Sequence, residues 1–165
     1  MNERYYLLWI QLLEIEPSIW RRFVVPSSIT LDRLHDVIQI VMGWHDSHLH
    51  EFTIGKKRYT EYPEWKEDGL ACGKYRLGDL VKQRGRTIHY LYDFGDGWEH
   101  EIVLEDSRYE NSALRFELFC LGGERACPPE DVGGVPGYYR FCDSLKDLDD
   151  EEHEQMMEWS GGEYD

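Results

Sequence analysis

Three histidines and an aspartate lie within six residues of each other, in the segment His45-Asp-Ser-His48-Leu-His50. If residues 48–54 are extended, the side chains of His48 and His50 point to the same face of the strand. Two neutral imidazoles on one face could bind a divalent metal, because imidazole suits zinc, iron, nickel and copper. The structural alternative is that His45 or His48 caps the end of a preceding helix and His50 is a hydrogen-bonded core residue. The pattern leaves both roles open.

A second polar group begins at Asp93, in the run Asp-Phe-Gly-Asp-Gly-Trp. Strand-like runs on either side of its glycines predict a β-hairpin over residues 87–105. Alternation along the second strand places Trp98 and His100 on the core side, where the polar imidazole requires a partner. Asp93 and Asp96 could supply that partner, or they could be ordinary turn residues.

Glu130 and Asp131 form the third group, inside a loop that the flanking Pro-Pro and Gly-Gly pairs prevent from forming helix or strand. Two adjacent carboxylates there could bind a cation or cap the following helix. The candidate pocket consists of His48, His50, Asp93, Asp96, Trp98, His100, Glu130 and Asp131. The candidate ligands for a divalent metal are His48, His50, Asp96, His100 and Glu130.

These groups meet in one pocket if the 87–105 hairpin lies beside a strand over 49–54. In that arrangement His50 and His100 approach each other, and the Glu130-Asp131 loop closes over them. The competing account is that the histidines hydrogen-bond the carboxylates and tie a loop to the sheet without a ligand.

The charge of the chain is strongly acidic, with 18 Lys and Arg against 33 Asp and Glu and a net charge of −15. Much of the excess lies in the C-terminal segment 143–165, which holds ten acidic side chains against Lys146. Nucleic-acid binding normally requires a basic stripe, so we expect no direct DNA or RNA binding.

Hydrophobic residues make up 41% of the chain, enough to bury a core. The sequence has no apolar run long enough to span a membrane and does not begin like a signal peptide, so we expect a cytoplasmic protein with reduced thiols. The four cysteines include no C-x-x-C pair. A structural zinc site that uses Cys120, Cys127 and a histidine stays open as an alternative.

The element pattern predicts one α+β domain over residues 1–165, with a mixed or antiparallel sheet that opens with a β-β-α unit and is packed by helices. The predicted strands are 5–15, 19–25, 49–54, 87–94, 98–105 and 115–121. The predicted helices are 31–42, a short turn at 77–81, 137–145 and 150–159. Residues 56–73 are predicted to be irregular.

Several motifs together resemble one known family. They are Ile19-Trp-Arg-Arg, Leu34-His35, Gly43-Trp44, His48-Leu-His50-x-Phe52, Tyr90-x-Tyr92-Asp-Phe-Gly-Asp96-x-Trp98-x-His100, Cys120 to Gly123, Cys127-Pro-Pro-Glu-Asp-Val-Gly-Gly134, and the acidic stretch Leu148 to Trp159. In this order they are similar to the plasmid pRiA4b ORF-3-like family. The resemblance implies a compact α+β domain and carries over no catalytic residue.

Two functions follow as hypotheses. The first is a non-enzymatic binding or interaction module for a protein partner, with the acidic C-terminal face or the aromatic-rich hairpin as its contact surface. The alternative is a metal-dependent hydrolase, in which three or four N and O ligands leave an open position that activates water. The oligomeric state stays open.

Overall fold

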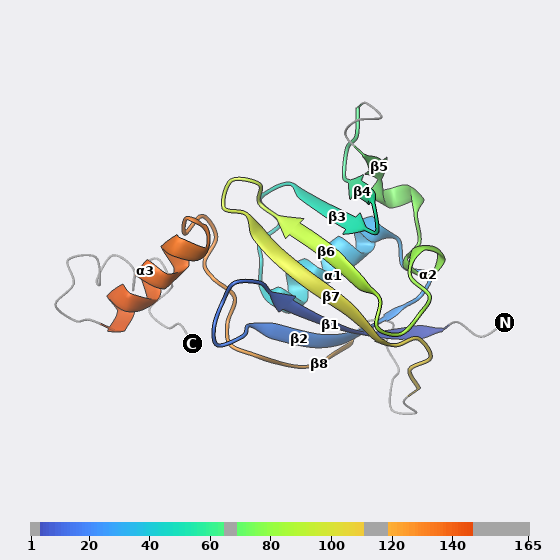
Figure 1. The fold of residues 1–165 in the computed structure, drawn as a ribbon, viewed down its shortest axis with the longest axis horizontal. Helices are drawn as coiled ribbons and strands as arrows, with labels where there is room; N and C mark the ends of the chain where they lie inside the picture. Colours follow the sequence, from blue (N-terminus) through green and yellow to red (C-terminus); the bar gives the residue numbers. More distant parts are fainter. Residues whose placement is uncertain (1–3, 65–68, 111–118, 147–165) are drawn as a thin grey trace.

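The structure is a computed structural model that describes residues 4–64, 69–110 and 119–146. Its core is one eight-stranded sheet with the strand order β5-β4-β3-β6-β7-β1-β2-β8 (Figure 1). The strands are β1 (Tyr5–Leu12), β2 (Trp20–Pro26), β3 (His50–Ile54), β4 (Lys57–Thr60), β5 (Leu70–Ala71), β6 (Thr87–Tyr92), β7 (Trp98–Asp106) and β8 (Phe119–Glu124). β4 and β5 are parallel, and the other neighbouring pairs are antiparallel. The predicted α+β class with a mixed sheet is confirmed.

The chain opens with the predicted β-β-α unit, formed by β1, β2 and helix α1 (Leu31–Met42). Every second residue of β1 is buried, as expected of a strand with one face on the core. β1 ends at Leu12 and not at residue 15, because the chain turns there and Glu14 takes a left-handed φ of 65°. α1 ends where predicted, at Gly43 with a φ of 96°.

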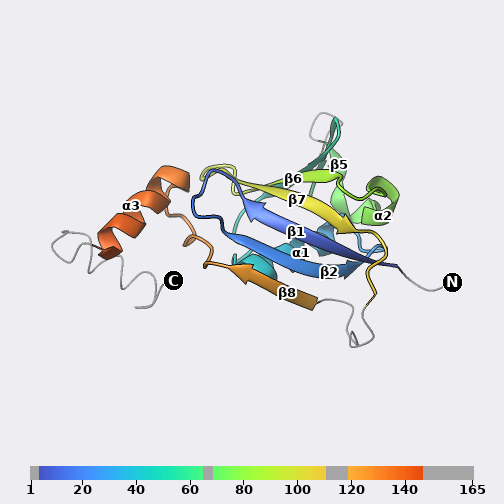
Figure 2. The same cartoon turned by 60° about the horizontal axis from the view of Figure 1, so that its bottom comes forward.

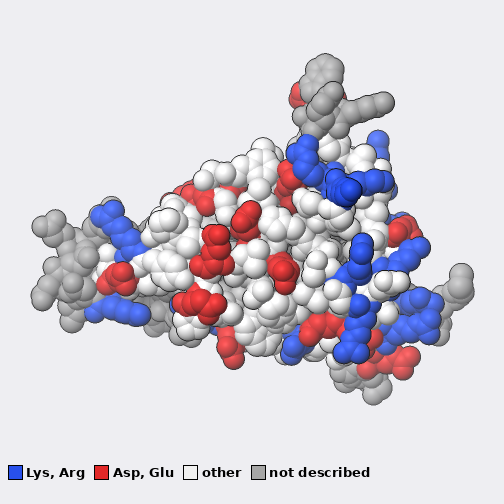
Figure 3. Space-filling view, in the orientation of Figure 1, with Lys and Arg blue, Asp and Glu red and all other residues white. Residues whose placement is uncertain are grey.

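Helix α1 covers one face of the sheet (Figures 1 and 2). Between the helix and the sheet lies the hydrophobic core, which includes Leu8, Ile10, Leu34, Ile38 and Ile102, each at most 1% exposed. On the opposite face, β7 presents glutamates at alternate positions. Figure 3 shows acidic side chains over the middle of the sheet and a group of lysine and arginine side chains at the end away from α3.

The prediction that residues 56–73 are irregular is wrong. They contain β4 and β5, the latter followed by a 3-10 turn at Cys72–Lys74. The polar composition concealed β4 because it lies near an edge of the sheet, where Tyr59 alone of its four residues is buried.

The remaining elements agree in part with the sequence. Helix α2 (Leu77–Leu80) lies at the predicted short turn, and helix α3 (Gly134–Lys146) begins three residues before the predicted 137. The first part of predicted strand 115–121 and the predicted helix 150–159 lie outside the described residues, as does most of the acidic segment 143–165. Within the described residues, no helix is long and apolar enough to cross a membrane.

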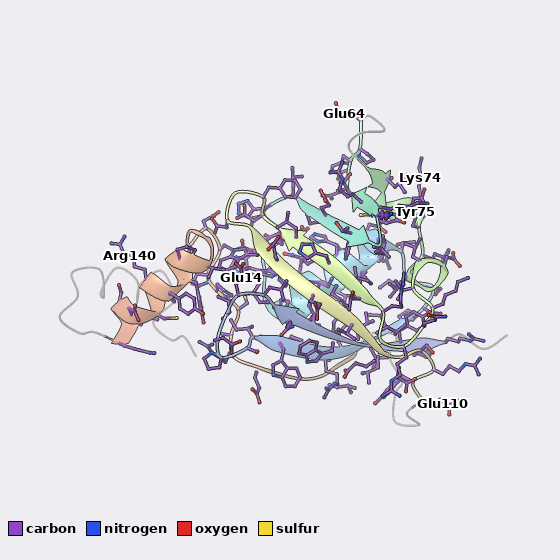
Figure 4. The ribbon with its side chains drawn as sticks, in the orientation of Figure 1. Glu14, Glu64, Lys74, Tyr75, Glu110 and Arg140 are labelled. Atoms are coloured by element: carbon purple, nitrogen blue, oxygen red, sulfur yellow. The ribbon has the colours of Figure 1, made fainter. Side chains whose placement is uncertain are left out.

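One end of the sheet faces α3, where the β6–β7 turn and the loop before α3 meet (Figure 1). Figure 4 shows Glu14 at this end, and the backbone carbonyl of Glu14 accepts a 3.3 Å hydrogen bond from the Tyr139 hydroxyl of α3. The candidate polar residues of the sequence gather at this end of the sheet.

Candidate functional site

The register of β3 and β6 brings two distant segments together. The two strands are antiparallel with His50 opposite Tyr92, so the residues just before β3 lie beside those just after β6. A 2.9 Å hydrogen bond from the Asp93 amide to the Leu49 carbonyl extends this pairing. His48 and Asp93 therefore share one end of the sheet, although 44 residues of chain separate them.

The loop before α3 closes over the same end of the sheet. One carboxylate oxygen of Glu130, Oε1, accepts hydrogen bonds from the His45 amide at 2.7 Å and from the Tyr92 hydroxyl at 2.9 Å. Burial raises the pKa of the Tyr92 phenol, so it remains a proton donor to this carboxylate. At Gly134, φ is +72° and a Cβ atom would lie 2.5 Å from the Asp96 carbonyl oxygen, so this approach requires glycine.

These segments bring five polar side chains together, here called the rim cluster: His48, Asp93, Asp96, Glu130 and Asp131. At its centre is Nε2 of His48, which lies 2.8 Å from Oδ1 of Asp131, 3.5 Å from Oδ2 of Asp93 and 3.7 Å from Oε2 of Glu130. Among the described residues, ligand atoms of His48, Asp93 and Glu130 lie within 4.8 Å of one another, as do those of Asp93, Asp96 and Asp131.

Two carboxylates of the rim cluster divide their oxygens between two tasks. Oδ1 of Asp93 accepts the amides of Gly95 and Asp96, at 3.1 and 3.2 Å, while Oδ2 faces His48. Glu130 likewise uses Oε1 for its hydrogen bonds and turns Oε2 towards His48. One oxygen of each residue thus fixes the loop, and the other is presented to the centre of the cluster.

The atoms at this centre are not satisfied by hydrogen bonds. Nε2 of His48 and Oε2 of Glu130 are both buried, and neither has a hydrogen-bond partner in the described part of the chain. The 2.8 Å contact of His48 with Asp131 is close enough for an ion pair but is not aligned as a hydrogen bond. Buried unpaired polar atoms are costly and call for an explanation such as an ion or a water.

The rim cluster is buried on one side and open on the other. The side chains of Asp93 and Glu130 are 8% and 12% exposed, whereas those of His48 and Asp131 are 27% and 66% exposed. An ion held by the buried carboxylates would therefore have a side that solvent or a ligand can reach.

The other three candidate residues, His50, Trp98 and His100, lie in the interior next to the rim cluster and are at most 2% exposed. The ring nitrogens of His100 are engaged, Nε2 with the Trp44 indole N–H at 3.2 Å and Nδ1 with the Tyr90 carbonyl at 3.1 Å. Burial lowers the pKa of His100 to about 4, so the ring is neutral at physiological pH.

His50 packs on helix α1 instead of pointing into the rim cluster. Its ring stacks on that of His35, with centroids 3.5 Å apart and planes 5° apart. Burial lowers its pKa to about 3. In the described ranges, the groups that could hold an ion contain neither His50 nor His100, and neither Cys120 nor Cys127.

The model of the family described as plasmid pRiA4b ORF-3-like protein matches residues 4–165. The chain belongs to the plasmid pRiA4b ORF-3-like family. A relative from Sinorhizobium fredii (strain NBRC 101917 / NGR234), described as uncharacterized protein y4hQ, is 40% identical over 161 residues, which are 96% of this chain and 82% of that protein.

The pRiA4b ORF-3-like fold is also seen in a crystal structure. MM3350 from Methanosarcina mazei Go1, described as a protein of unknown function, superposes with a TM-score of 0.88 and 34% sequence identity over 100% of this chain and 94% of that chain. The match covers 82% of the Sinorhizobium protein and 94% of the Methanosarcina protein, and the description of neither protein names a ligand.

Sequence reasoning overlooked the polar residues that hold this pRiA4b ORF-3-like site in place. Tyr92 links the sheet to the loop before α3 through its hydroxyl, which accepts the Ser47 amide at 2.9 Å and donates to Glu130. The sequence places Asp93 in the candidate pocket but not among the candidate ligands, and it offers Asp131 as a cation ligand only as the neighbour of Glu130. The sequence does contain a signal for Asp93. This residue directly follows the predicted strand that pairs with the strand after His48, so the two side chains are expected at the same end of the sheet.

Proposed function

We propose that this protein is a binding module that holds a divalent transition-metal ion in the rim cluster and presents it to a protein partner. One observation carries the proposal: Nε2 of His48 and Oε2 of Glu130 are buried without hydrogen bonds and face each other at 3.7 Å beside Oδ2 of Asp93. A single ion would satisfy all three atoms at once.

The spacing of these atoms suits an ion. Two ligand atoms that each lie about 2.1 Å from a tetrahedral ion are about 3.4 Å apart. The distances from Nε2 of His48 to the oxygens of Asp93 and Glu130 are 3.5 and 3.7 Å. One imidazole with carboxylates favours zinc or manganese, since magnesium and calcium prefer oxygen ligands alone.

The open side of the site supports a binding role. With Asp93 and Glu130 below and the partly exposed His48 beside it, an ion would keep a coordination position for a donor atom from a partner. The acidic side chains around the site favour a partner that contributes few negative charges. The net charge of −15 supports a protein partner over a nucleic acid, and cysteines that form no disulfide bonds in the described part of the chain support a cytoplasmic location.

The same open position favours a second candidate, a metal-dependent hydrolase that activates a bound water. Incubation of the metal-loaded protein with chromogenic ester and phosphoester substrates separates the two. Turnover that is lost in His48→Gln supports the hydrolase, whereas stoichiometric metal binding without turnover supports the binding module.

Elemental analysis of protein purified without an affinity tag tests the metal itself. We expect about one equivalent of a transition metal per chain, reduced at least tenfold in His48→Gln and in Glu130→Gln. His89→Gln is the matched control. His89 lies 3.6 Å from the Glu99 carboxylate on the sheet, and among the described residues it belongs to no group that could hold a metal ion.

Metal-free protein that gains no thermal stability from added zinc or manganese would overturn the proposal. In that case His48 acts as an ion-pair partner that ties the loop to the sheet.

A further inference from the structure

Beside the rim cluster, the surface of β3 and β4 is hollowed by a pocket of about 360 Å³. Three large apolar side chains border it: Leu49, Tyr62 and Phe94, which are 56%, 78% and 50% exposed. Leu49 directly follows His48 and Phe94 directly follows Asp93, so the pocket begins where the rim cluster ends. Exposed apolar side chains around a hollow mark a binding surface more often than scattered ones do.

The lining of this pocket also contains polar groups that lack partners. His50 is 2% exposed, and neither of its ring nitrogens has a hydrogen-bond partner in the described part of the chain. The hydroxyl oxygen of Thr60 is also buried and has no hydrogen-bond partner among the described residues. The Glu61 carboxylate lies 3.9 Å from Nδ1 of His50. The pocket thus combines an apolar border with convergent polar groups, as small-ligand and side-chain pockets do.

The polar groups of the pocket are mainly hydrogen-bond acceptors. A carboxylate offers two acceptor oxygens and no donor, a hydroxyl offers two lone pairs and one O–H donor, and a neutral imidazole offers one acceptor nitrogen and one N–H donor. The charged residues of the lining are Glu51, Arg58 and Glu61, and Arg58 forms an ion pair with Glu51 at 3.4 Å. The charge that remains is the negative charge of Glu61, so the complementary ligand is a cation with several N–H donors.

We infer that this pocket binds an arginine side chain of a protein partner. The planar guanidinium carries five donors, which match the acceptors of Glu61, Thr60 and His50. Its flat faces stack on aromatic rings, and Tyr62 and Phe94 are exposed at the border. A lysine ammonium matches less well, because it is a compact charge that neither stacks nor forms paired hydrogen bonds. The aliphatic stem of arginine packs against Leu49.

A protein chain fits this pocket better than a free small molecule, because exposed apolar side chains at the border could also contact the residues on either side of the arginine. Leu49 and Tyr62 remain more than half exposed and would cover the residues that flank the arginine. This inference goes beyond the proposed metal site and does not depend on it, since none of the polar groups of the pocket is a member of the rim cluster.

The test is titration of the metal-free full-length protein, in the presence of a chelator, with the capped peptide acetyl-Ala-Arg-Ala-amide, followed by NMR or calorimetry. We expect saturable binding that is at least about tenfold weaker for the lysine peptide and for the citrulline peptide, which lacks the charge. Glu61→Gln and Phe94→Ala should each weaken binding of the arginine peptide about tenfold or more.

Two matched controls use side chains outside the pocket. Glu99→Gln removes an exposed carboxylate and Ile40→Ala removes an apolar side chain that is 78% exposed, and both should bind the arginine peptide like the parent protein. Absence of saturable binding, or equal weakening by Glu99→Gln and Glu61→Gln, would overturn the inference. Tighter binding of free arginine than of the capped peptide would also overturn it, in favour of a small-molecule ligand. Because no metal is present, these outcomes leave the rim-cluster proposal unaffected.

Discussion

Acid should destabilise this protein through His100 well before its carboxylates are protonated. His100 is fully buried, and desolvation lowers its pKa from 6.5 to about 4 in the folded state. In the unfolded chain the imidazole regains its ordinary pKa near 6.5 and binds a proton more readily than the folded state does. The free energy of unfolding therefore falls as pH drops below 6.5, and this loss ends near pH 4.

The size of the effect follows from the two pKa values. Between pH 7.5 and pH 5, a group that shifts from 6.5 to about 4 lowers the free energy of unfolding by about 2 kcal/mol. His100→Gln removes the titrating group, although it also weakens the contact with the Trp44 indole and so lowers stability at every pH. The expected result is that the variant loses about 2 kcal/mol less than the parent protein between these pH values.

Guanidinium unfolding at the two pH values, followed by tryptophan fluorescence, measures this difference. Ile40→Ala is the control, because it removes an exposed side chain that does not titrate, and it should show the pH dependence of the parent. If His100→Gln loses as much stability on acidification as the parent does, burial does not hold the imidazole of His100 neutral.

Three further predictions concern the packing around the site. Gly134→Ala should lower the free energy of unfolding by at least about 1 kcal/mol in a denaturant titration and should weaken metal binding, because a Cβ atom would lie 2.5 Å from the Asp96 carbonyl oxygen. Tyr90→Phe should cost about 1 to 3 kcal/mol in the same assay, because its hydroxyl lies within hydrogen-bond distance of a buried imidazole and a buried amide. At pH 8 a thiol reagent should modify the exposed Cys120 first and reach Cys72 after unfolding, since burial raises the pKa of the Cys72 thiol to about 12; peptide mass spectrometry reads out both sites.

The fold could be predicted where hydrophobic periodicity and local signals agree. The bounds of α1 follow from its apolar stripe and Gly43, and the β6–β7 hairpin follows from its glycine-rich turn. β4 could not be predicted in this way, because an exposed strand near the sheet edge needs few apolar residues. Its pairing depends on β3, a contact that local composition does not reveal.

The residue types of the candidate site could be predicted from the sequence, but which of these residues face one another could not. Sequence spacing grouped His48 with His50, because both were expected on one face of a strand. In the structure β3 begins at His50, so His48 precedes the strand and its side chain is free to face Asp93 and Glu130. The expected alternation holds within a strand and does not extend to His48, which lies two residues before β3 begins.

X-ray diffraction from crystals grown with zinc or manganese would show whether one ion joins His48, Asp93 and Glu130. Data collected on both sides of the absorption edge of the metal identify the element at the position of the peak. We expect one anomalous peak about 2.0 to 2.2 Å from Nε2 of His48 and from the facing oxygens of Asp93 and Glu130. A map without a peak in the rim cluster, with the His48 ring hydrogen-bonded directly to a carboxylate, would contradict it.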